Sequence, residues 1–300
     1  MSRNIFFFIV QVKSRIFTLG IALLLTTTAW GQMNYGMTGL MNMPTADMQQ
    51  DKTVMFGGSW LTHHMTVPRW WYDTWNYSLN ITIFPWLEVG YLCMGHKAVP
   101  TDYGNESGYW VEENYGRFVN QDRSWHVRLR LWKEGWWKAW TPQVVVGSND
   151  VTSGAGSNPS LASATDGGAS NGFQNRYWLA VTKHFCFKGV GNLGAHLTWI
   201  YSDRFDNDVN SPAIGADFHF GLGDNEKGWQ KVVNCFTLMA ECLPGFTDVD
   251  EDLVYDPDGA RYQVNLGLMC TCWSDHINAV FEMGRCRYPS VTLQLKLHLK

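Results

Sequence analysis

Strict alternation of apolar and polar residues is the feature that most constrains the fold of this chain. The last ten residues are the clearest case. Their apolar residues are Val291, Leu293, Leu295, Leu297 and Leu299, and the polar residues between them are Thr292, Gln294, Lys296 and His298. Successive side chains of a β-strand point to opposite faces, so this segment has one aliphatic face and one polar face. Similar alternation returns at residues 77–83, 126–131, 263–268 and 276–283. The pattern predicts an all-β chain.

The connections between these segments favour a barrel over a soluble sandwich, which alternation alone would also fit. We expect about twelve strands, near residues 53–61, 75–84, 86–95, 125–132, 142–150, 175–185, 191–202, 212–221, 233–243, 260–272, 275–284 and 290–300. Connections after even-numbered strands are short or modest, at 85, 133–141, 186–190, 222–232 and 273–274. Connections after odd-numbered strands are mostly longer, at 62–74, 96–124, 151–174, 203–211 and 244–259, with 285–289 short. Short turns at one rim and long loops at the other are typical of outer-membrane barrels.

The composition agrees with a chain that meets lipid. Charged residues make up 17% of the chain and aromatic residues 15%. The aromatic residues gather at both expected rims: Trp86, Trp136, Trp137, Trp140, Trp229 and Trp273 at short turns, and Trp70, Trp71, Trp75, Tyr109, Trp110 and Trp125 beside long loops. A net charge of −4 argues against nucleic-acid binding, and no apolar stretch after residue 31 is long enough for a membrane-spanning helix. We therefore predict a transmembrane antiparallel up-and-down β-barrel, closed so that no strand edge is unpaired.

The N-terminal 31 residues have the pattern of a cleaved secretory signal peptide, with a retained membrane anchor as the alternative. Basic residues precede an apolar run at 16–25, and Ala29 and Gly31 are small enough for a cleavage site. Cleavage leaves 20 basic against 27 acidic residues, a net charge of −7. We expect an irregular plug or entry segment at residues 32–51, rich in Met and Gly, and the barrel at 52–300.

Particular strings resemble the YjbH family of bacterial outer-membrane proteins. Residues 36–46, which contain Gly39, Pro44 and Thr45, look like that family's Gly-Leu-x-x-x-Pro-Thr-Ala signature. Residues 129–150 are similar to its central hairpin, in which a Leu-x-x-Glu-Gly turn leads into a strand that ends in Gly-x-x-Asp. The following strand, with Lys183, is also similar, and the chain would be a short, single-barrel version of the family.

We interpret the matching motif residues as structural. Gly39 and Gly135 permit turn geometry, Pro44 fixes an entry segment that is not a strand, Thr45 belongs to the same signature, and Glu134 would cap the tight turn. A saccharide contact is the alternative role for Glu134 and for Asp150.

The resemblance implies a non-enzymatic protein of the Gram-negative outer membrane that assists export or assembly of a surface exopolysaccharide or capsule. Its expected partners are outer-membrane lipid and lipopolysaccharide, the polysaccharide, and periplasmic exopolysaccharide-secretion proteins, but no nucleic acid. A barrel enzyme acting on lipid or lipopolysaccharide and a general narrow porin remain the alternatives.

The polar faces of the strands predict which residues line the lumen. The candidates for glycan contact are His126, Arg128, Arg130, Trp178, Gln294, Lys296 and His298. A barrel of about twelve strands encloses a narrow space, and we expect a polar network to close much of it, with an open channel as the alternative. Glu88, Asp217, Glu241 and Glu282 supply counter-charges. The Cys and His residues show no metal-ligand spacing, so we expect no metal and no cofactor.

Overall fold

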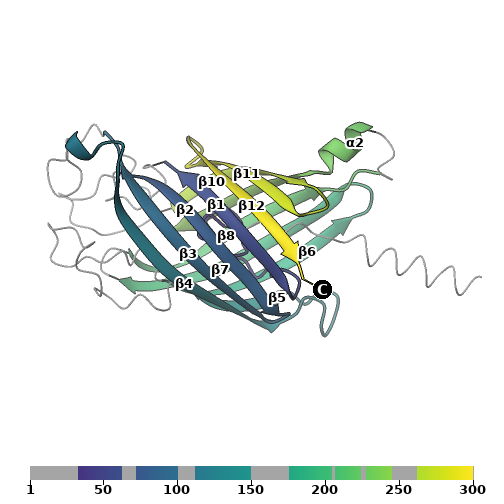
Figure 1. Cartoon of the computed structure of the whole chain (residues 1–300). Coiled ribbons are helices and arrows are strands. Elements are labelled where there is room, and N and C mark those ends of the chain that lie inside the picture. The colour runs from purple at the N-terminus through teal and green to yellow at the C-terminus, as the bar shows by residue number, and fades with distance from the viewer. Residues whose placement is uncertain are drawn as a thin grey trace, which may run out of the picture.

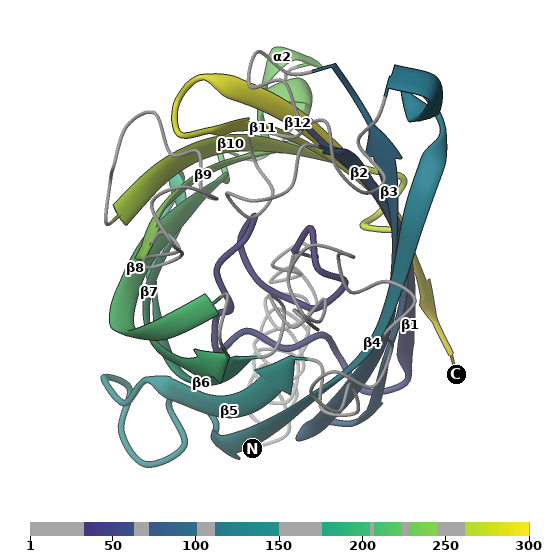
Figure 2. The same ribbon diagram turned by 90° about the vertical axis from the view of Figure 1, so that its left-hand side faces the viewer.

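The computed structural model is a closed antiparallel barrel with an N-terminal segment running inside it (Figures 1 and 2). The structure describes residues 33–62, 72–100, 112–149, 176–204, 207–223, 228–244 and 262–299. The strands are β1 (Thr53–Leu61), β2 (Tyr72–Phe84), β3 (Leu87–Ala98), β4 (Phe118–Trp132), β5 (Gln143–Asn149), β6 (Arg176–Phe187), β7 (Gly191–Arg204), β8 (Asn207–Phe220), β9 (Phe236–Pro244), β10 (Tyr262–Cys272), β11 (Ile277–Gly284) and β12 (Tyr288–His298). Each strand pairs with its neighbours in the chain, and β1 pairs with β12. The predicted fold class is confirmed.

Each predicted strand overlaps an observed one, but several strands are longer than the alternation indicated. β4 begins at Phe118 rather than near residue 125, and only residues 205–206 separate β7 from β8. Most of the extra residues of β4 are polar in the sequence, as in the run from Asn120 to Ser124, so this stretch shows no apolar–polar alternation. The difference in connection length between the two ends of the barrel is therefore smaller than predicted, because the expected long connection at 203–211 is reduced to residues 205–206.

The remaining regular elements are two short helices. The 3-10 helix η1 (Glu112–Asn114) precedes β4, and α2 (Gly228–Val233) lies in the connection before β9. β9 consequently begins at Phe236 rather than near residue 233. Within the described part of the chain, no helix has the length and hydropathy needed to cross a membrane.

We call the rim formed by the turns 85–86, 133–142, 188–190, 221–235 and 273–276 the short-turn rim, and the opposite one the long-loop rim. Exposed tryptophans mark the short-turn rim, as predicted: Trp86, Trp136, Trp137, Trp140, Trp229 and Trp273. Near the long-loop rim, Trp75 and Trp125 are exposed. The other predicted aromatics there, Trp70, Trp71, Tyr109 and Trp110, lie outside the described residues.

The outer face of the wall is apolar, whereas the inner face combines polar side chains with apolar ones such as Leu92 and Met94. In β12, Leu293, Leu295 and Leu297 are exposed, whereas Thr292, Gln294 and Lys296 are buried. An apolar outer band is the surface that a barrel needs in order to face acyl chains. The alternation thus predicted the correct face for this strand.

The hydrophobic core lies inside the barrel, between the wall and residues 33–49, which we call the plug. Every plug residue is buried, and Figure 2 shows this segment, in purple, within the ring of strands. Its apolar members are largely methionines and pack against wall residues in one cluster that includes Met33, Met37, Met41, Met43, Leu92, Met94, Met239 and Met269. Unbranched thioether side chains fill irregular gaps well. Close approach is possible because Gly215 and Gly267 of the wall lack a Cβ where Leu40 and Met41 lie.

Candidate functional site: the contacts between plug and wall

The plug contains a tight hairpin, and its tip is held by one wall carboxylate. Gly39 and Pro44 form an antiparallel bridge, and the Leu40 N–H donates to the Met43 carbonyl at 3.1 Å. Within this turn, the backbone N–H groups of Met41, Asn42 and Met43 donate to the carboxylate of Glu241 on β9 at 3.0–3.2 Å. These donors would otherwise be buried without a partner, which is costly.

The side chain of Asn42 extends the same anchor to a second strand. Its amide donates to Glu241 at 3.0 Å and to Glu282 of β11. Asn34 of the plug also donates to Glu282, at 2.6 Å, and Asn265 donates to Glu241 at 2.8 Å. The two buried carboxylates are thereby saturated with hydrogen bonds from plug and wall.

A buried arginine makes the second anchor. The guanidinium of Arg128 on β4 donates to the backbone carbonyls of Thr38, Thr45 and Asp47. It forms an ion pair with Glu88 of β3 at 3.4 Å, and both side chains are fully buried. Glu88 in turn accepts the N–H and the hydroxyl of Thr38 at 3.0 and 2.9 Å. The five donors of a guanidinium suit such a cluster of carbonyls.

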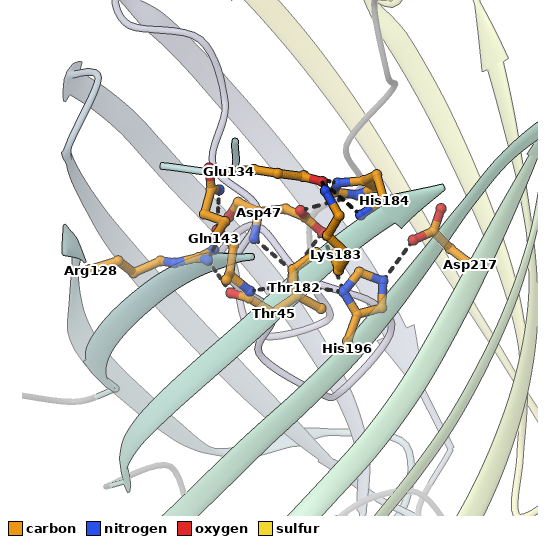
Figure 3. Close-up of polar contacts among 11 residues, drawn as sticks. Thr45, Asp47, Arg128, Glu134, Gln143, Thr182, Lys183, His184, His196 and Asp217 are labelled. Carbon is orange, nitrogen blue, oxygen red and sulfur yellow. Dashed lines mark hydrogen bonds and ion pairs between the residues drawn. The ribbon is translucent and has the colours of Figure 1, made fainter. Parts of the chain in front are cut away.

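The third anchor surrounds Asp47, near the short-turn rim (Figure 3). Asp47 Oδ2 accepts the Thr45 hydroxyl at 3.0 Å. Asp47 Oδ1 lies 3.5 Å from His184 Nε2 on β6, and Oδ2 lies 3.7 Å from His196 Nδ1 on β7. His196 Nε2 contacts Asp217 Oδ1 of β8 at 2.7 Å. One plug carboxylate is therefore surrounded by side chains from three consecutive strands.

Glu134 joins this cluster from the turn between β4 and β5. Its Oε2 lies 2.6 Å from His184 Nδ1, and its Oε1 accepts Lys183 Nζ at 2.7 Å and the His184 N–H at 3.0 Å. Glu134 therefore binds the next hairpin instead of capping its own turn, which corrects the predicted capping role. Gly135 does have the positive φ expected of a turn glycine, +70°.

The two carboxyl groups of this cluster that lie outside the strands have opposite pKa shifts. Burial raises the pKa of Asp47, and the nearby His196 and His184 rings offset part of that rise. Burial also acts to raise the pKa of Glu134, but hydrogen bonds from His184 and Lys183 outweigh it and lower the pKa to about 2. Glu134 is therefore a firmly ionised partner, whereas Asp47 is a carboxylate in a costly position.

The predicted lumen residues fall into different settings. His126, Arg128, Trp178, Gln294 and Lys296 are buried inside the barrel, Arg130 is half-buried, and His298 is exposed at the end of β12. Trp178 packs against Arg128, with the guanidinium carbon 5.1 Å from its ring centroid, and Lys296 pairs with Asp275 at 2.9 Å. Contact between any of these residues and a glycan remains a prediction.

Several motif residues meet at one place although they are far apart in the sequence. Thr45 and Glu134 both belong to the cluster around Asp47, together with Lys183 (Figure 3). Pro44 lies next to them, and its carbonyl accepts the Thr198 hydroxyl at 2.6 Å. Asp150 lies outside the described residues.

Asp47, Thr182 and His184 were not anticipated as site residues. The alternation that placed Trp178 inward continues through Thr182 to His184, so their inward direction could have been read from β6. Asp47 directly follows the Pro-Thr-Ala string but gave no sign of its partners.

A closed barrel with an apolar outer face, buried polar side chains on its inner face and a plug defines the class of this protein: a β-barrel of the outer-membrane type. Residues 31–158 match the model of the YjbH family, described as "Exopolysaccharide biosynthesis protein YbjH". The predicted family resemblance is thereby confirmed over that part of the chain.

Comparison with individual proteins gives partial likenesses. The "Uncharacterized lipoprotein YjbH" of Escherichia coli (strain K12) is 28% identical over 121 residues, which are 40% of this chain and 14% of that protein. This chain thus corresponds to a small part of that relative. Among solved structures, the COG4313 outer membrane channel from Pseudomonas putida F1 aligns with a TM-score of 0.43 at 8% identity, over 83% of this chain and 96% of that one. The outer membrane phospholipase (OMPLA) of Salmonella typhi aligns with a TM-score of 0.33 at 9% identity, over 87% and 95%.

Proposed function

We propose that this protein is a non-enzymatic barrel of the Gram-negative outer membrane that assists the export or assembly of a surface exopolysaccharide. The observation that carries the proposal is the extent of the family match. Residues 31–158 contain the whole plug together with Arg128 and Glu134 of the wall. The part shared with an exopolysaccharide family thus includes the segment that lies inside the barrel.

The plug limits how the barrel could assist. The plug is buried against the wall and is bound there by Glu241 and by Arg128. A sugar chain would therefore have to displace the plug in order to pass. We propose that the plugged barrel works with periplasmic secretion proteins at its short-turn rim and contacts lipopolysaccharide with its outer face. A general narrow porin would conduct small solutes without plug displacement.

One arrangement favours an enzyme as the second candidate. Thr182 Oγ1 lies 2.9 Å from His196 Nδ1, and His196 Nε2 lies 2.7 Å from Asp217 Oδ1, which is the connectivity of a hydroxyl, imidazole and carboxylate triad. However, Thr182 is fully buried, and its Oγ1 accepts the Ala46 N–H at 2.9 Å. The plug therefore covers the hydroxyl that would have to attack a substrate.

Deletion of the gene in its native host tests the proposal. We expect the amount of surface polysaccharide per cell to fall and to recover when the wild-type gene is restored. Unchanged amount and composition of that polysaccharide would contradict the proposed role. Turnover of phospholipid or lipopolysaccharide by the purified protein, lost in Thr182→Ala, would favour the enzyme instead.

A further inference from the structure

Three side chains, one from the plug and two from the wall, place ligand atoms close to one another at the junction of plug and wall. They are Asp47 of the plug, His184 of β6 and Asp217 of β8, and one ligand atom from each lies within 4.8 Å of the other two (Figure 3). The geometry points to a binding site for a zinc-like divalent cation, which would link the plug to two wall strands. This site goes beyond the proposed function and differs from the expectation that the chain has no metal.

The unused oxygen of Asp47 is the first reason. Among the residues that the structure describes, Asp47 Oδ1 has no hydrogen-bond partner, although only 4% of the residue is exposed. Its other oxygen accepts the Thr45 hydroxyl, which fixes the carboxylate with Oδ1 directed at the His184 ring. A buried carboxylate oxygen without a hydrogen bond is costly and needs a reason.

The spacing of the ligand atoms is the second reason. His184 Nε2 and Asp47 Oδ1 are 3.5 Å apart, long for a hydrogen bond between charged groups. Two ligands that bind one tetrahedral zinc at about 2.0–2.2 Å lie roughly 3.3 Å from each other. The pair is therefore already spaced as an edge of such a site, and the ligand atom of Asp217 lies within 4.8 Å of both.

The supporting hydrogen bonds are the third reason. Histidines that bind metals usually donate their other ring N–H to a carboxylate or carbonyl. His184 has this arrangement, because its Nδ1 lies 2.6 Å from Glu134 Oε2. Asp217 is held in turn by His196 at 2.7 Å. Gly194 leaves the space for this last pair, since a Cβ there would lie 2.9 Å from His196 Nε2.

Charge and access agree with a divalent cation. The cluster gathers the carboxylates of Asp47, Asp217 and Glu134 beside the ammonium of Lys183. The side chains of His184 and Asp217 remain 19% and 16% exposed, so an ion can enter from the short-turn rim and keep a water molecule as a further ligand. One imidazole with two carboxylates suits zinc, whereas calcium requires six to eight oxygen ligands.

Zinc binding by the full chain, folded in detergent micelles, tests this inference. We expect one zinc per folded chain, measured by elemental analysis after dialysis and by competition with a chromophoric chelator. Asp217→Ala and His184→Gln should each weaken zinc binding at least tenfold, and Glu134→Gln, which removes only a positioning partner, by about 10- to 100-fold. His219→Gln is the matched control, because His219 lies on β8 with Asp217 but outside the cluster. Its zinc affinity should equal that of the wild type.

The unfolding temperature provides a second readout, measured on an electrophoresis gel in which the folded and the heat-unfolded barrel migrate as separate bands. Zinc should raise the temperature at which the folded band of the wild type converts to the unfolded band, because a ligand of the folded state stabilises it. The same gel confirms that each variant is folded. Absence of zinc from the folded wild type, equal zinc affinity in Asp217→Ala and His184→Gln, or displacement of zinc by equimolar calcium would each overturn the inference. In the first case, the cluster would be held by the hydrogen bonds and ion pairs of its own side chains alone.

Discussion

Arg128 Nη2 donates to the backbone carbonyl of Asp47 at 2.6 Å, which joins the middle of β4 to the end of the plug. The same guanidinium reaches the carbonyls of Thr38 and Thr45. A single wall side chain therefore contacts both ends of the plug hairpin and fixes it to the wall.

Arg128→Lys should destabilise the protein despite keeping the charge. A lysine ammonium lacks the planar fork that reaches several carbonyls at once, so buried acceptors lose their donors. We expect the free energy of unfolding to fall by roughly 2 to 4 kcal/mol. Urea titration in lipid vesicles measures this change. Arg130→Lys, two residues along on the same face, should change it by less than about 0.5 kcal/mol, and similar losses for both variants would contradict the role of Arg128.

Glu241→Ala should loosen the plug. The substitution leaves the N–H groups of Met41, Asn42 and Met43 without their shared acceptor. We expect the wild type to conduct little ionic current in planar bilayers and the variant to show frequent open events. Glu241→Gln, which keeps one acceptor oxygen, should lie between them. Glu113→Ala, in the exposed helix η1, is the control, and a rise in conductance there or none in Glu241→Ala would count against the anchor.

Leu293→Arg should test the membrane-facing band. Leu293 lies in the middle of β12 with 58% of its surface exposed. An arginine at the midplane of a barrel wall costs about 2 to 4 kcal/mol, and one near the interface costs about 0 to 1 kcal/mol. Leu299→Arg, on the same face beyond the strand end, should therefore be mild. Unfolding in vesicles compares the two, and equal losses would mean that this face does not meet hydrocarbon.

Gly147→Ala should disturb the lumen through Trp178. A Cβ at Gly147 would overlap the indole ring, which lies between β5 and Arg128. Overpacking of this kind costs roughly 1 to 3 kcal/mol. Gly58→Ala should leave stability unchanged or raise it, since the nearest atom to its Cβ would be at an ordinary 3.6 Å. If unfolding of Gly147→Ala matches that of the wild type, the tight packing around Trp178 is incorrect.

The fold could be predicted because alternation records the direction of every side chain relative to the wall. Residues 291–299 show this most simply, and their inward and outward faces are as expected. Alternation misplaced some strand ends, as at the start of β4, where most residues are polar, and at the start of β9, where α2 precedes the strand.

The candidate site could be predicted only in part. Alternation shows that a side chain points into the barrel, but it does not show which residue that side chain contacts there. Arg128 and Glu241 were expected inside the barrel, but their bonds to the plug depend on the path of an irregular segment that has no periodicity. Asp47 lies near Asp217 because the paired strands β6, β7 and β8 pass beside the plug. Such contacts follow from barrel closure and not from any local pattern.

Closure of the barrel between β1 and β12 is the central claim, and a cysteine pair tests it most directly. Thr53 and His298 are opposite each other in that ladder, with Thr53 Oγ1 3.0 Å from His298 Nδ1. After replacement of the native cysteines by serine, Thr53→Cys with His298→Cys should form a disulfide within the folded monomer and alter its mobility on a non-reducing denaturing gel. Thr53→Cys with Lys296→Cys, offset by two residues, should react far less. A folded monomer in which the first pair stays reduced, or in which the offset pair reacts as readily, would contradict a barrel closed in this register.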